Sequence, residues 1–334
     1  MAENHQLSRT NKSSYEIRGK TKLIGQSEAI KRIHLTIDMV SDSPTPVLIS
    51  GDSGTGKEVV AHLIHDRSPR QDRPFLAVNC AALPKDIFEN ELFGHDQGAF
   101  TGANGRKEGY LEMANGGTLF FDEMAEMHPD IQAKLLRVLE TKSFRRLGGK
   151  EEIKVDVRTL AATNRDVQLA LKTGDLRLDL YYRFSVIEIH LPPLRERKED
   201  IPLLIESFLE SLCVAHKKNS MTLSAEALEA MIQYDWPGNV RELHNVIERA
   251  VIISKFSEIG PEILPERIIG KLRTTPKSIT IPVGTSLKEV ERILIQQTLA
   301  SVGNNKTKAA KVLGLSRKAL HNKLGIYNSS LPND

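Results

Sequence analysis

The sequence predicts an α/β domain with a doubly wound parallel sheet, followed by a helical region and a small all-helical unit. Short apolar runs alternate with helical patterns in the first part of the chain, at residues 46–50, 75–78, 118–121, 157–162 and 186–191. This alternation is typical of a parallel sheet with helices on both faces. After residue 191 the pattern is helical, and a stretch rich in Pro, Ser and Thr then precedes the last helices.

These patterns divide the 334 residues into five segments. We expect a flexible polar tail (1–20), an α/β subdomain (21–191), a helical subdomain (192–270), a linker (271–286) and a helical C-terminal domain (287–334). No apolar run is long enough to span a bilayer, and the first twenty residues lack the apolar core of a signal peptide. We therefore expect a cytoplasmic protein with no membrane partner. Cys80 and Cys213 show no metal-ligand spacing and are expected to be reduced and buried.

A glycine-rich loop follows the first apolar run and precedes an amphipathic helix at residues 58–65. The loop consists of Gly51, Asp52, Ser53, Gly54, Thr55, Gly56 and Lys57. Glycines allow backbone N–H groups to curl around phosphates, and the helix N-terminus adds a positive dipole. Lys57 would reach the outer phosphates of ATP. Glu58 departs from the general pattern, which has Ser or Thr here to bind magnesium. The alternative is a glycine-rich turn that binds no ligand.

Two adjacent acids, Asp122 and Glu123, follow the apolar run at residues 118–121. Ligands in doubly wound folds bind at the carboxyl ends of the strands. Asp122 would hold Mg²⁺, directly or through water, and Glu123 would polarise the water that attacks the nucleotide. The alternative is structural, with Asp122 capping a helix and Glu123 in its first turn.

The hexapeptide Gly98, Ala99, Phe100, Thr101, Gly102, Ala103 follows the motif ELFGH at residues 91–95. Glycines on both sides of Phe100 and Thr101 indicate a mobile loop that exposes an aromatic contact; in the alternative, Phe100 folds back onto the protein. The motif resembles the hallmark of sigma-54-dependent activators, the bacterial enhancer-binding proteins, and the resemblance extends over residues 23–269. It implies a AAA+ P-loop ATPase with a helical lid. It also implies that this loop contacts sigma-54 RNA polymerase holoenzyme.

The resemblance assigns further residues around the nucleotide. Asn79 matches the family's switch residue, which holds Glu123 aside until hydrolysis. Thr163 and Asn164 match the first sensor of the terminal phosphate. From the residues alone, Asn79 could instead satisfy backbone groups at a strand end, and Thr163 with Asn164 could form a turn.

Arg177 and Arg183 match the family's two arginine fingers, although Leu176 stands where the family usually has Phe. The planar, permanently charged guanidinium suits a clamp on phosphoryl oxygens. The alternative is helix-surface arginines paired with acids such as Asp179. The finger interpretation implies that each ATP site needs a neighbouring subunit, in a ring that is usually a hexamer, with dimeric intermediates.

Arg241 lies in the motif WPGNVREL and matches the second sensor, on the lid; the alternative is an ion pair with Glu242 or Glu248. Ile24 and Gly25 are expected near the adenine. Residues 192–197 are expected to join the two subdomains, without a catalytic role.

The C-terminal unit reads as a helix at residues 287–301, then a helix, a tight turn at Gly314 and a second helix capped by Ser316. Residues 303–327 contain six Lys or Arg and no acid. The segment resembles a Fis-type helix-turn-helix, whose reading helix would present Ser316, Arg317, Lys318, His321, Asn322 and Lys323 to double-stranded DNA. The alternative is an oligomerisation hairpin, and residues 287–301 could form a dimer contact.

Together these features predict an ATP-dependent transcription activator. It would bind an enhancer-like upstream DNA site, form a ring and remodel the sigma-54 polymerase closed complex into an open complex. Two alternatives are a AAA+ remodeller with another client and a DNA-binding regulator with a degenerate ATPase. Because only about twenty residues precede the ATPase, we expect either a regulatory partner acting in trans or a chain cut from a longer receptor.

Overall fold

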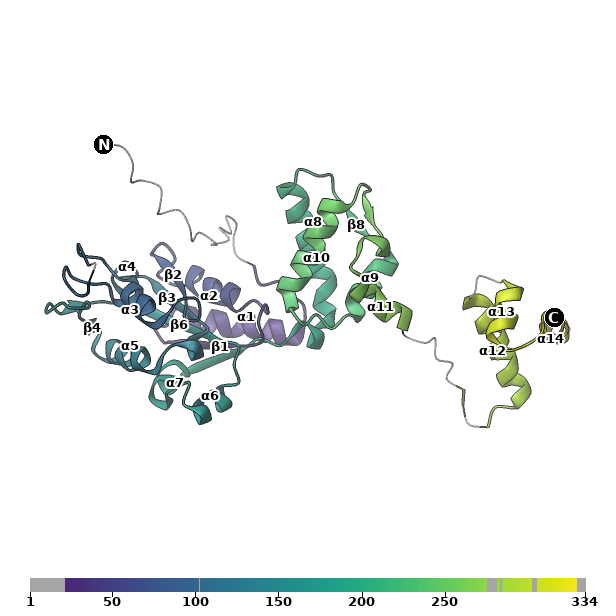
Figure 1. Ribbon diagram of the computed structural model, residues 1–334, viewed down its shortest axis with the longest axis horizontal. Helices are drawn as coiled ribbons and strands as arrows, with labels where there is room; N and C mark the ends of the chain where they lie inside the picture. Colours follow the sequence, from purple (N-terminus) through teal and green to yellow (C-terminus); the bar gives the residue numbers. More distant parts are fainter. Residues whose placement is uncertain (1–21, 102, 275–280, 283, 302–304, 329–334) are drawn as a thin grey trace. The chain divides into compact units, whose positions relative to one another are not determined.

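The computed structural model describes residues 22–328, except residues 102, 275–280, 283 and 302–304 (Figure 1). The chain divides into two compact units, Met1–Leu272 and Arg273–Asp334. The tail predicted at residues 1–20 and part of the predicted linker lie outside the described residues. Within the described part of the chain, no helix is long and apolar enough to cross a membrane.

A five-stranded parallel sheet forms the centre of the first unit, in the order β2-β3-β6-β1-β7. Its strands are β1 (Val47–Ser50), β2 (Phe75–Asn79), β3 (Thr118–Asp122), β6 (Arg158–Thr163) and β7 (Ile187–His190). The predicted doubly wound parallel sheet is confirmed. β1 lies between β6 and β7, with Leu48 opposite Ala161 on one side and Glu188 on the other.

Helices cover both faces of this sheet because side chains alternate along each strand. On one face, Val47 and Ile49 pack with α1 (Glu28–Ser41) and α2 (Lys57–Asp66). On the other face, Leu48 and Phe121 pack with α3 (Lys85–Phe93), α5 (Pro129–Thr141) and α7 (Leu178–Phe184). The central strands β1, β3 and β6 are therefore buried on both sides, which explains why they are largely apolar, whereas the edge strands β2 and β7 are more exposed.

Shorter elements connect the strands. They are α4 (Tyr110–Met113), η1 (Met124–Glu126), α6 (Val167–Thr173), and an antiparallel hairpin of β4 (Ser143–Phe144) and β5 (Ile153–Lys154). The sequence did not predict this hairpin, whose strands have only two residues each.

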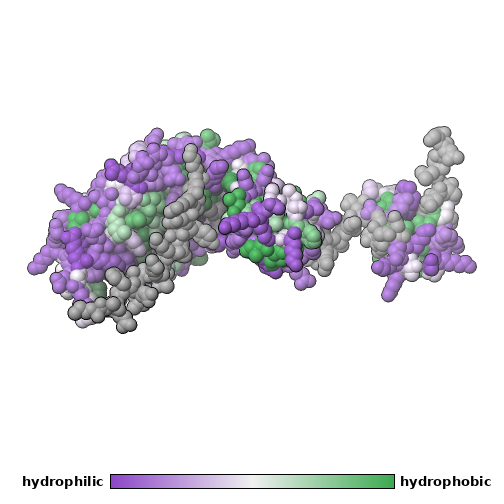
Figure 2. All heavy atoms as spheres, turned by 90° about the horizontal axis from the view of Figure 1, so that it is seen from above, coloured by the Kyte–Doolittle hydropathy of each residue, from purple (hydrophilic) through white to green (hydrophobic). Residues whose placement is uncertain are grey.

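The lid follows β7 and is helical, as predicted. It contains η2 (Leu194–Glu196), η3 (Lys198–Asp200), α8 (Ile201–Ala215), α9 (Ala225–Gln233), α10 (Asn239–Ile253), η4 (Pro261–Ile263) and α11 (Glu266–Thr274). A two-stranded parallel ladder of β8 (Thr222–Leu223) and β9 (Glu258–Ile259) was not predicted. The buried Trp236 lies in the lid core, where its indole N–H donates to the Met231 carbonyl at 2.7 Å. In the space-filling view the surface is mostly hydrophilic, with apolar side chains gathered over the lid (Figure 2).

The second unit is a helical unit of α12 (Leu287–Ser301), α13 (Lys306–Val312) and α14 (Arg317–Asn328). Its small core contains Ile295, Leu299 and Leu320. Asn305 caps α13, the predicted turn residue Gly314 has a positive φ of 66°, and the Ser316 hydroxyl accepts from the Ala319 N–H at 3.1 Å. The helix, turn and helix therefore form as the sequence predicts.

Candidate active site and recognition elements

The glycine-rich loop connects β1 to α2 at the carboxyl edge of the sheet, as predicted. Gly54 has a φ of +77°, and a Cβ there would lie 2.5 Å from the Gly238 carbonyl oxygen. Only glycine combines this left-handed backbone with so close an approach to the lid. The tip of the loop is therefore packed directly against the lid.

Donors from the lid hold three successive carbonyls of this loop. Asn239 Nδ2 donates to the Ser53 carbonyl at 2.9 Å, and Arg197 Nη2 donates to the Thr55 carbonyl at 3.0 Å. Between them, the Gly54 carbonyl accepts two backbone N–H groups at the start of α10. Because a carbonyl and the following N–H point in opposite directions across a trans peptide, the next N–H groups of the loop turn away from the lid. Of these, the Thr55 N–H donates to the Asp52 carbonyl at 3.4 Å, whereas the N–H groups of Gly54 and Gly56 have no hydrogen-bond partner among the described residues and can bind an anion.

Lys57 lies at the start of α2 and is buried. Its Nζ donates to the Gly51 carbonyl at 2.9 Å and to the Asp52 carbonyl at 3.3 Å. Burial lowers the pKa of the Lys57 ammonium, while the negative charges of Glu123 and Asp122 act in the opposite direction. These three side chains therefore share one electrostatic environment, as expected for a phosphate site with its carboxylates.

Asp122 ends β3, and Glu123 follows in a left-handed conformation with a φ of 55°. The Glu123 carboxylate accepts the Asn164 backbone N–H at 3.1 Å. Burial raises the pKa of the Glu123 carboxyl, although the Lys57 charge partly opposes the rise. Asp122 does not cap a helix, because η1 begins after Glu123 without a side-chain cap. The structural alternative for this acidic pair is therefore not what the fold shows.

Asn79 and Thr163 both make local turn contacts. Asn79 is opposite Asp122 in the sheet, but its side-chain oxygen accepts the Ala81 N–H at 2.9 Å. The Thr163 hydroxyl accepts the Arg165 N–H at 3.1 Å. In this structure Glu123 is held by Asn164, so the switch contact between Asn79 and Glu123 stays a prediction.

The three predicted arginines differ in their surroundings. Arg177 forms an ion pair with Asp179 at 2.7 Å, and Arg183 donates to the Leu139 carbonyl at 2.8 Å. These contacts fit the alternative of helix-surface arginines within one chain. Arg241 instead reaches the glycine-rich loop, with Nη1 3.1 Å from the Ser53 hydroxyl. The two acids proposed as its partners pair elsewhere, Glu242 with Arg267 and Glu248 with His216.

Arg197 and Asn239 contact the loop. Arg197 lies in the predicted junction of the two subdomains, whereas no sequence pattern marks Asn239 as a contact to the loop. Arg197 is 1% exposed and Asn239 is 0% exposed. Ile24 packs against the lid core, and Gly25 lies against the Asp200 carboxylate, so both are at the junction of sheet domain and lid. Arginines are rarely buried, so a buried one points to a specific role. The sequence does not show that Arg197 is buried, so it could not have indicated this role.

The predicted contact loop at residues 98–103 is closed by its own backbone. The Gly98 N–H donates to the Ala103 carbonyl, and the Ala103 N–H donates to the Phe100 carbonyl, both at 3.0 Å. Phe100 is 46% exposed and meets the His95 ring edge-on at 5.0 Å between centroids. Its surroundings therefore combine features of both interpretations. Ala99 and exposed Thr101 are described, whereas Gly102 lies outside the described residues.

Four of the predicted DNA-reading side chains are exposed along the start of α14: Arg317, Lys318, His321 and Asn322. Lys323 is half-buried, because it forms an ion pair with Glu291 of α12 at 2.5 Å. Ser316 is used as the helix cap. The helix thus presents a polar face with Lys323 turned toward its own unit.

Comparisons with known proteins agree with this architecture. Residues 23–190 match the sigma-54 interaction domain family, residues 195–280 match the AAA+ ATPase lid domain, and residues 286–327 match the bacterial regulatory protein, Fis family. The chain is 44% identical over 310 residues to regulatory protein AtoC of Escherichia coli strain K12, covering 91% of this chain and 67% of that protein.

Two crystal structures of NtrX from Brucella abortus, one in complex with ADP and one with ATP, are 33% identical to the chain. Their TM-scores are 0.69 and 0.68, and they cover 91% and 92% of this chain. The chain spans about two thirds of the length of these relatives. It belongs to the sigma-54-dependent transcriptional activators, in which a AAA+ ATPase with a helical lid is joined to a Fis-type helix-turn-helix.

Proposed function

We propose that this chain binds upstream DNA through α14 and assembles a ring that hydrolyses ATP between subunits. Hydrolysis moves the loop at residues 98–103 against sigma-54, and the closed polymerase complex becomes an open one. The observation that carries this proposal is the gathering of Lys57, Asp122 and Glu123 at the sheet edge beside the lid-held loop. NtrX, which has been solved with ATP and with ADP, supports the choice of ATP as the nucleotide.

The chemical roles follow from the contacts. The N–H groups of Gly54 and Gly56 and the Lys57 ammonium bind the phosphates. Glu123 orients and polarises the attacking water, and its present partner, the Asn164 N–H, keeps the carboxylate at the edge of the site. Arg241 reports on the nucleotide from the lid, because it already contacts the loop through Ser53.

A magnesium ion fits the donor set, because Asp122 offers a carboxylate at the end of β3 beside the phosphate loop. When bound, Mg²⁺ would neutralise charge on the phosphate oxygens. Glu58 is exposed at the start of α2 and lies 4.0 Å from His62. We therefore assign magnesium to Asp122 and not to the position after Lys57.

The ring assignment depends on the arginine fingers. Arg177 and Arg183 lie at the two ends of α7, and their partners in the single chain are Asp179 and a carbonyl of α5. An ion pair that is half exposed to water is weak. A neighbour's phosphates, which carry more charge, would outcompete it. Each site would then be completed by the next subunit, in a ring of six reached through dimers.

Movement of the contact loop would come from differing stability of its positions across nucleotide states. Its base is connected to the sheet domain through His95 and Asp96, and Asp96 pairs with the buried Arg146 of the β4–β5 hairpin at 3.2 Å. Its tip carries the half-exposed Phe100, which can leave the His95 ring without opening the core. The tip is thus the part that changes partner at lowest cost.

Lys57→Ala tests the motor. The variant should lose ATP hydrolysis and open-complex formation, because no cation remains for the outer phosphates, and should keep DNA binding, measured by gel shift. Retention of both activities would contradict the proposed site.

Thr101→Ala tests the contact loop. It should keep the ATPase rate within about twofold and lose transcription activation, measured by open-complex formation on a sigma-54 promoter. Capture of sigma-54 by the wild type, with an ATP transition-state analogue, should fail in the variant. Equal loss of ATPase and activation would mean that the loop is structural.

A further inference from the structure

The segment that carries Arg177 is held by one buried glutamine. Gln132 lies in α5 and is 0% exposed. Its Oε1 accepts the Arg177 N–H at 2.9 Å. Its Nε2 donates to the Asp175 carbonyl at 2.6 Å and to the Met127 carbonyl at 2.7 Å. Because Met127 directly follows η1, which begins after Glu123, this amide joins the segment after Glu123 to the segment before α7.

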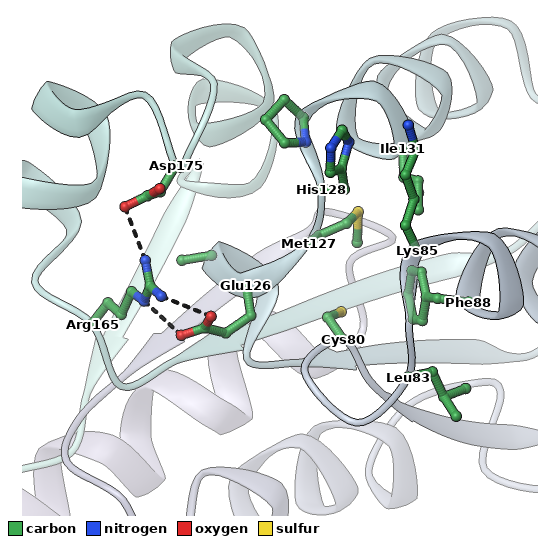
Figure 3. A pocket seen from close by; sticks show the side chains of 12 residues that line it. Cys80, Leu83, Lys85, Phe88, Glu126, Met127, His128, Ile131, Arg165 and Asp175 are labelled. Atoms are coloured by element: carbon green, nitrogen blue, oxygen red, sulfur yellow. Dashed lines mark hydrogen bonds and ion pairs between the residues drawn. The ribbon is translucent and has the colours of Figure 1, made fainter.

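Arg165 makes a second connection between the same segments. Its Nε and Nη2 donate to the Glu126 carboxylate at 2.6 and 2.7 Å, and its Nη1 donates to Asp175 Oδ2 at 2.9 Å. Figure 3 shows the guanidinium between these two carboxylates. Arg165 follows Asn164, whose N–H is the hydrogen-bond donor to Glu123. Both connections therefore link segments close to Glu123, namely η1 with Met127 and residues 164–165, to residues 175–177.

The surroundings give this region room to shift. A cavity of about 300 Å³ is lined by Cys80, Met127, His128, Arg165 and Asp175, among others (Figure 3). Motion of η1 or of residues 164–165 can displace Asp175 into this space, and the neighbouring Arg177 with it, without disturbing the close-packed interior. Hydrogen bonds transmit such a displacement because they are directional, and both the oxygen and the nitrogen of the Gln132 amide are engaged.

We propose that Gln132 and Arg165 are positioning residues that couple Glu123 of one subunit to Arg177 of the same subunit, and so to the ATP site of its neighbour. The inference rests on the proposed ring and arginine fingers. When nucleotide and water change the contacts of Glu123, η1 and Asn164 shift with it, and Arg177 follows. Neighbouring sites then do not hydrolyse ATP independently.

Two substitutions separate this role from simple stability. Arg165→Lys keeps the charge at a surface position but lacks the planar fork that bridges both carboxylates. Gln132→Glu keeps an acceptor for the Arg177 N–H but loses both donors. Arg67→Lys is the matched control, because Arg67 is 38% exposed, against 39% for Arg165, and pairs with the single acid Asp38. Thermal unfolding of each full-length variant, without nucleotide, reports on folding.

The first measurement is steady-state ATPase. Mispositioning the finger should lower kcat by roughly ten- to a hundredfold, while KM for ATP stays within about twofold, since neither residue contacts the glycine-rich loop in the described structure. A variant that is only less stable would lower the active fraction in proportion to its unfolding and would recover at lower temperature. Arg67→Lys should behave as the wild type.

The second measurement uses mixed rings, in which wild-type subunits are diluted with Lys57→Ala subunits that keep their arginine fingers. If the sites are coupled, the ATPase activity of the mixed rings falls more steeply than the fraction of wild-type subunits. If they are not coupled, the activity falls in proportion to that fraction. We expect a steep curve for wild type and for Arg67→Lys, and a linear curve in the Arg165→Lys and Gln132→Glu backgrounds. A linear wild-type curve, or a steep curve with unchanged kcat in both variants, would overturn this inference alone. A wild type that neither assembles nor hydrolyses ATP would overturn the proposed function as well.

Discussion

Replacing Asn239 by Asp should weaken nucleotide binding through the glycine-rich loop. Asn239 opens α10 with a φ of +53°, a conformation that Asn and Asp tolerate better than most residues. Its Oδ1 accepts the Leu194 N–H at 2.8 Å, and its Nδ2 donates to the Ser53 carbonyl at 2.9 Å. Aspartate preserves the backbone conformation and the acceptor, but it places a second oxygen against the Ser53 carbonyl.

The magnitude follows from the lost donor. The bond to the Ser53 carbonyl is part-buried, so the lost donor and the repulsion between the new carboxylate and this carbonyl together cost about 1–3 kcal/mol. If this free energy is lost only in the nucleotide-bound state, in which the loop presents its N–H groups to the phosphates, ADP affinity falls by roughly 5- to 150-fold. If it is lost in the nucleotide-free folded protein as well, the free energy of unfolding falls by about 1–3 kcal/mol.

Isothermal titration with ADP, together with denaturant unfolding of the nucleotide-free protein, measures both effects. Asn245→Asp adds the same charge further along the same helix, at a residue that lines the pocket beside Ser53 but makes no hydrogen bond to its carbonyl in the described structure, and is the control. Adenosine, which lacks phosphates, should bind the Asn239→Asp variant and the wild type alike. The reasoning is refuted if Asn239→Asp matches Asn245→Asp in both ADP affinity and stability.

Two further predictions follow from buried titratable groups. Since burial raises the pKa of Glu123, the ionised form that polarises water should be lost on acidification at a pH above the ordinary range of a glutamate; the acid limb of the kcat/KM profile measures this, and a limb at or below pH 4.5 would contradict it. Burial also raises the pKa of the Cys80 thiol, so iodoacetamide should label Cys80 only after denaturation; mass spectrometry of the folded and the denatured protein checks this, and equal labelling of both would contradict it.

The sheet could be predicted because its strands are short, mainly apolar runs bounded by polar residues, and the central ones are buried on both faces. The run at residues 186–191, for example, contains β7 (Ile187–His190), with one extra residue at each end. The β4–β5 hairpin and the β8–β9 ladder could not be predicted, because two-residue strands show no periodicity. Their position depends on tertiary contacts, such as the ion pairs of Arg146 with Asp96 and Glu112.

The candidate site shows the same division between local and long-range information. Loop 51–57 and the pair of acids are contiguous motifs, so the sequence alone indicates them. Asn239 reaches Ser53 across 186 positions and Arg197 reaches Thr55 across 142. A single sequence has no pattern that marks such pairs, because each residue type is ordinary until its burial and its partner are known.

The buried polar groups at this junction explain how the lid and the phosphate loop can influence each other. Apolar contacts tolerate sliding, whereas the bonds from Asn239, from Arg197 and from the first N–H groups of α10 hold defined carbonyls in defined directions. Burial lowers the pKa of the Arg197 guanidinium, and its Nε has no hydrogen-bond partner among the described residues. Arg197 therefore keeps its hydrogen bond to the Thr55 carbonyl even though its buried Nε stays without a partner in the described part of the chain. If the lid rotates, it must either break these bonds or carry residues 53–55 with it. Phosphate affinity and lid angle are therefore linked, and by reciprocity whatever shifts one must shift the other.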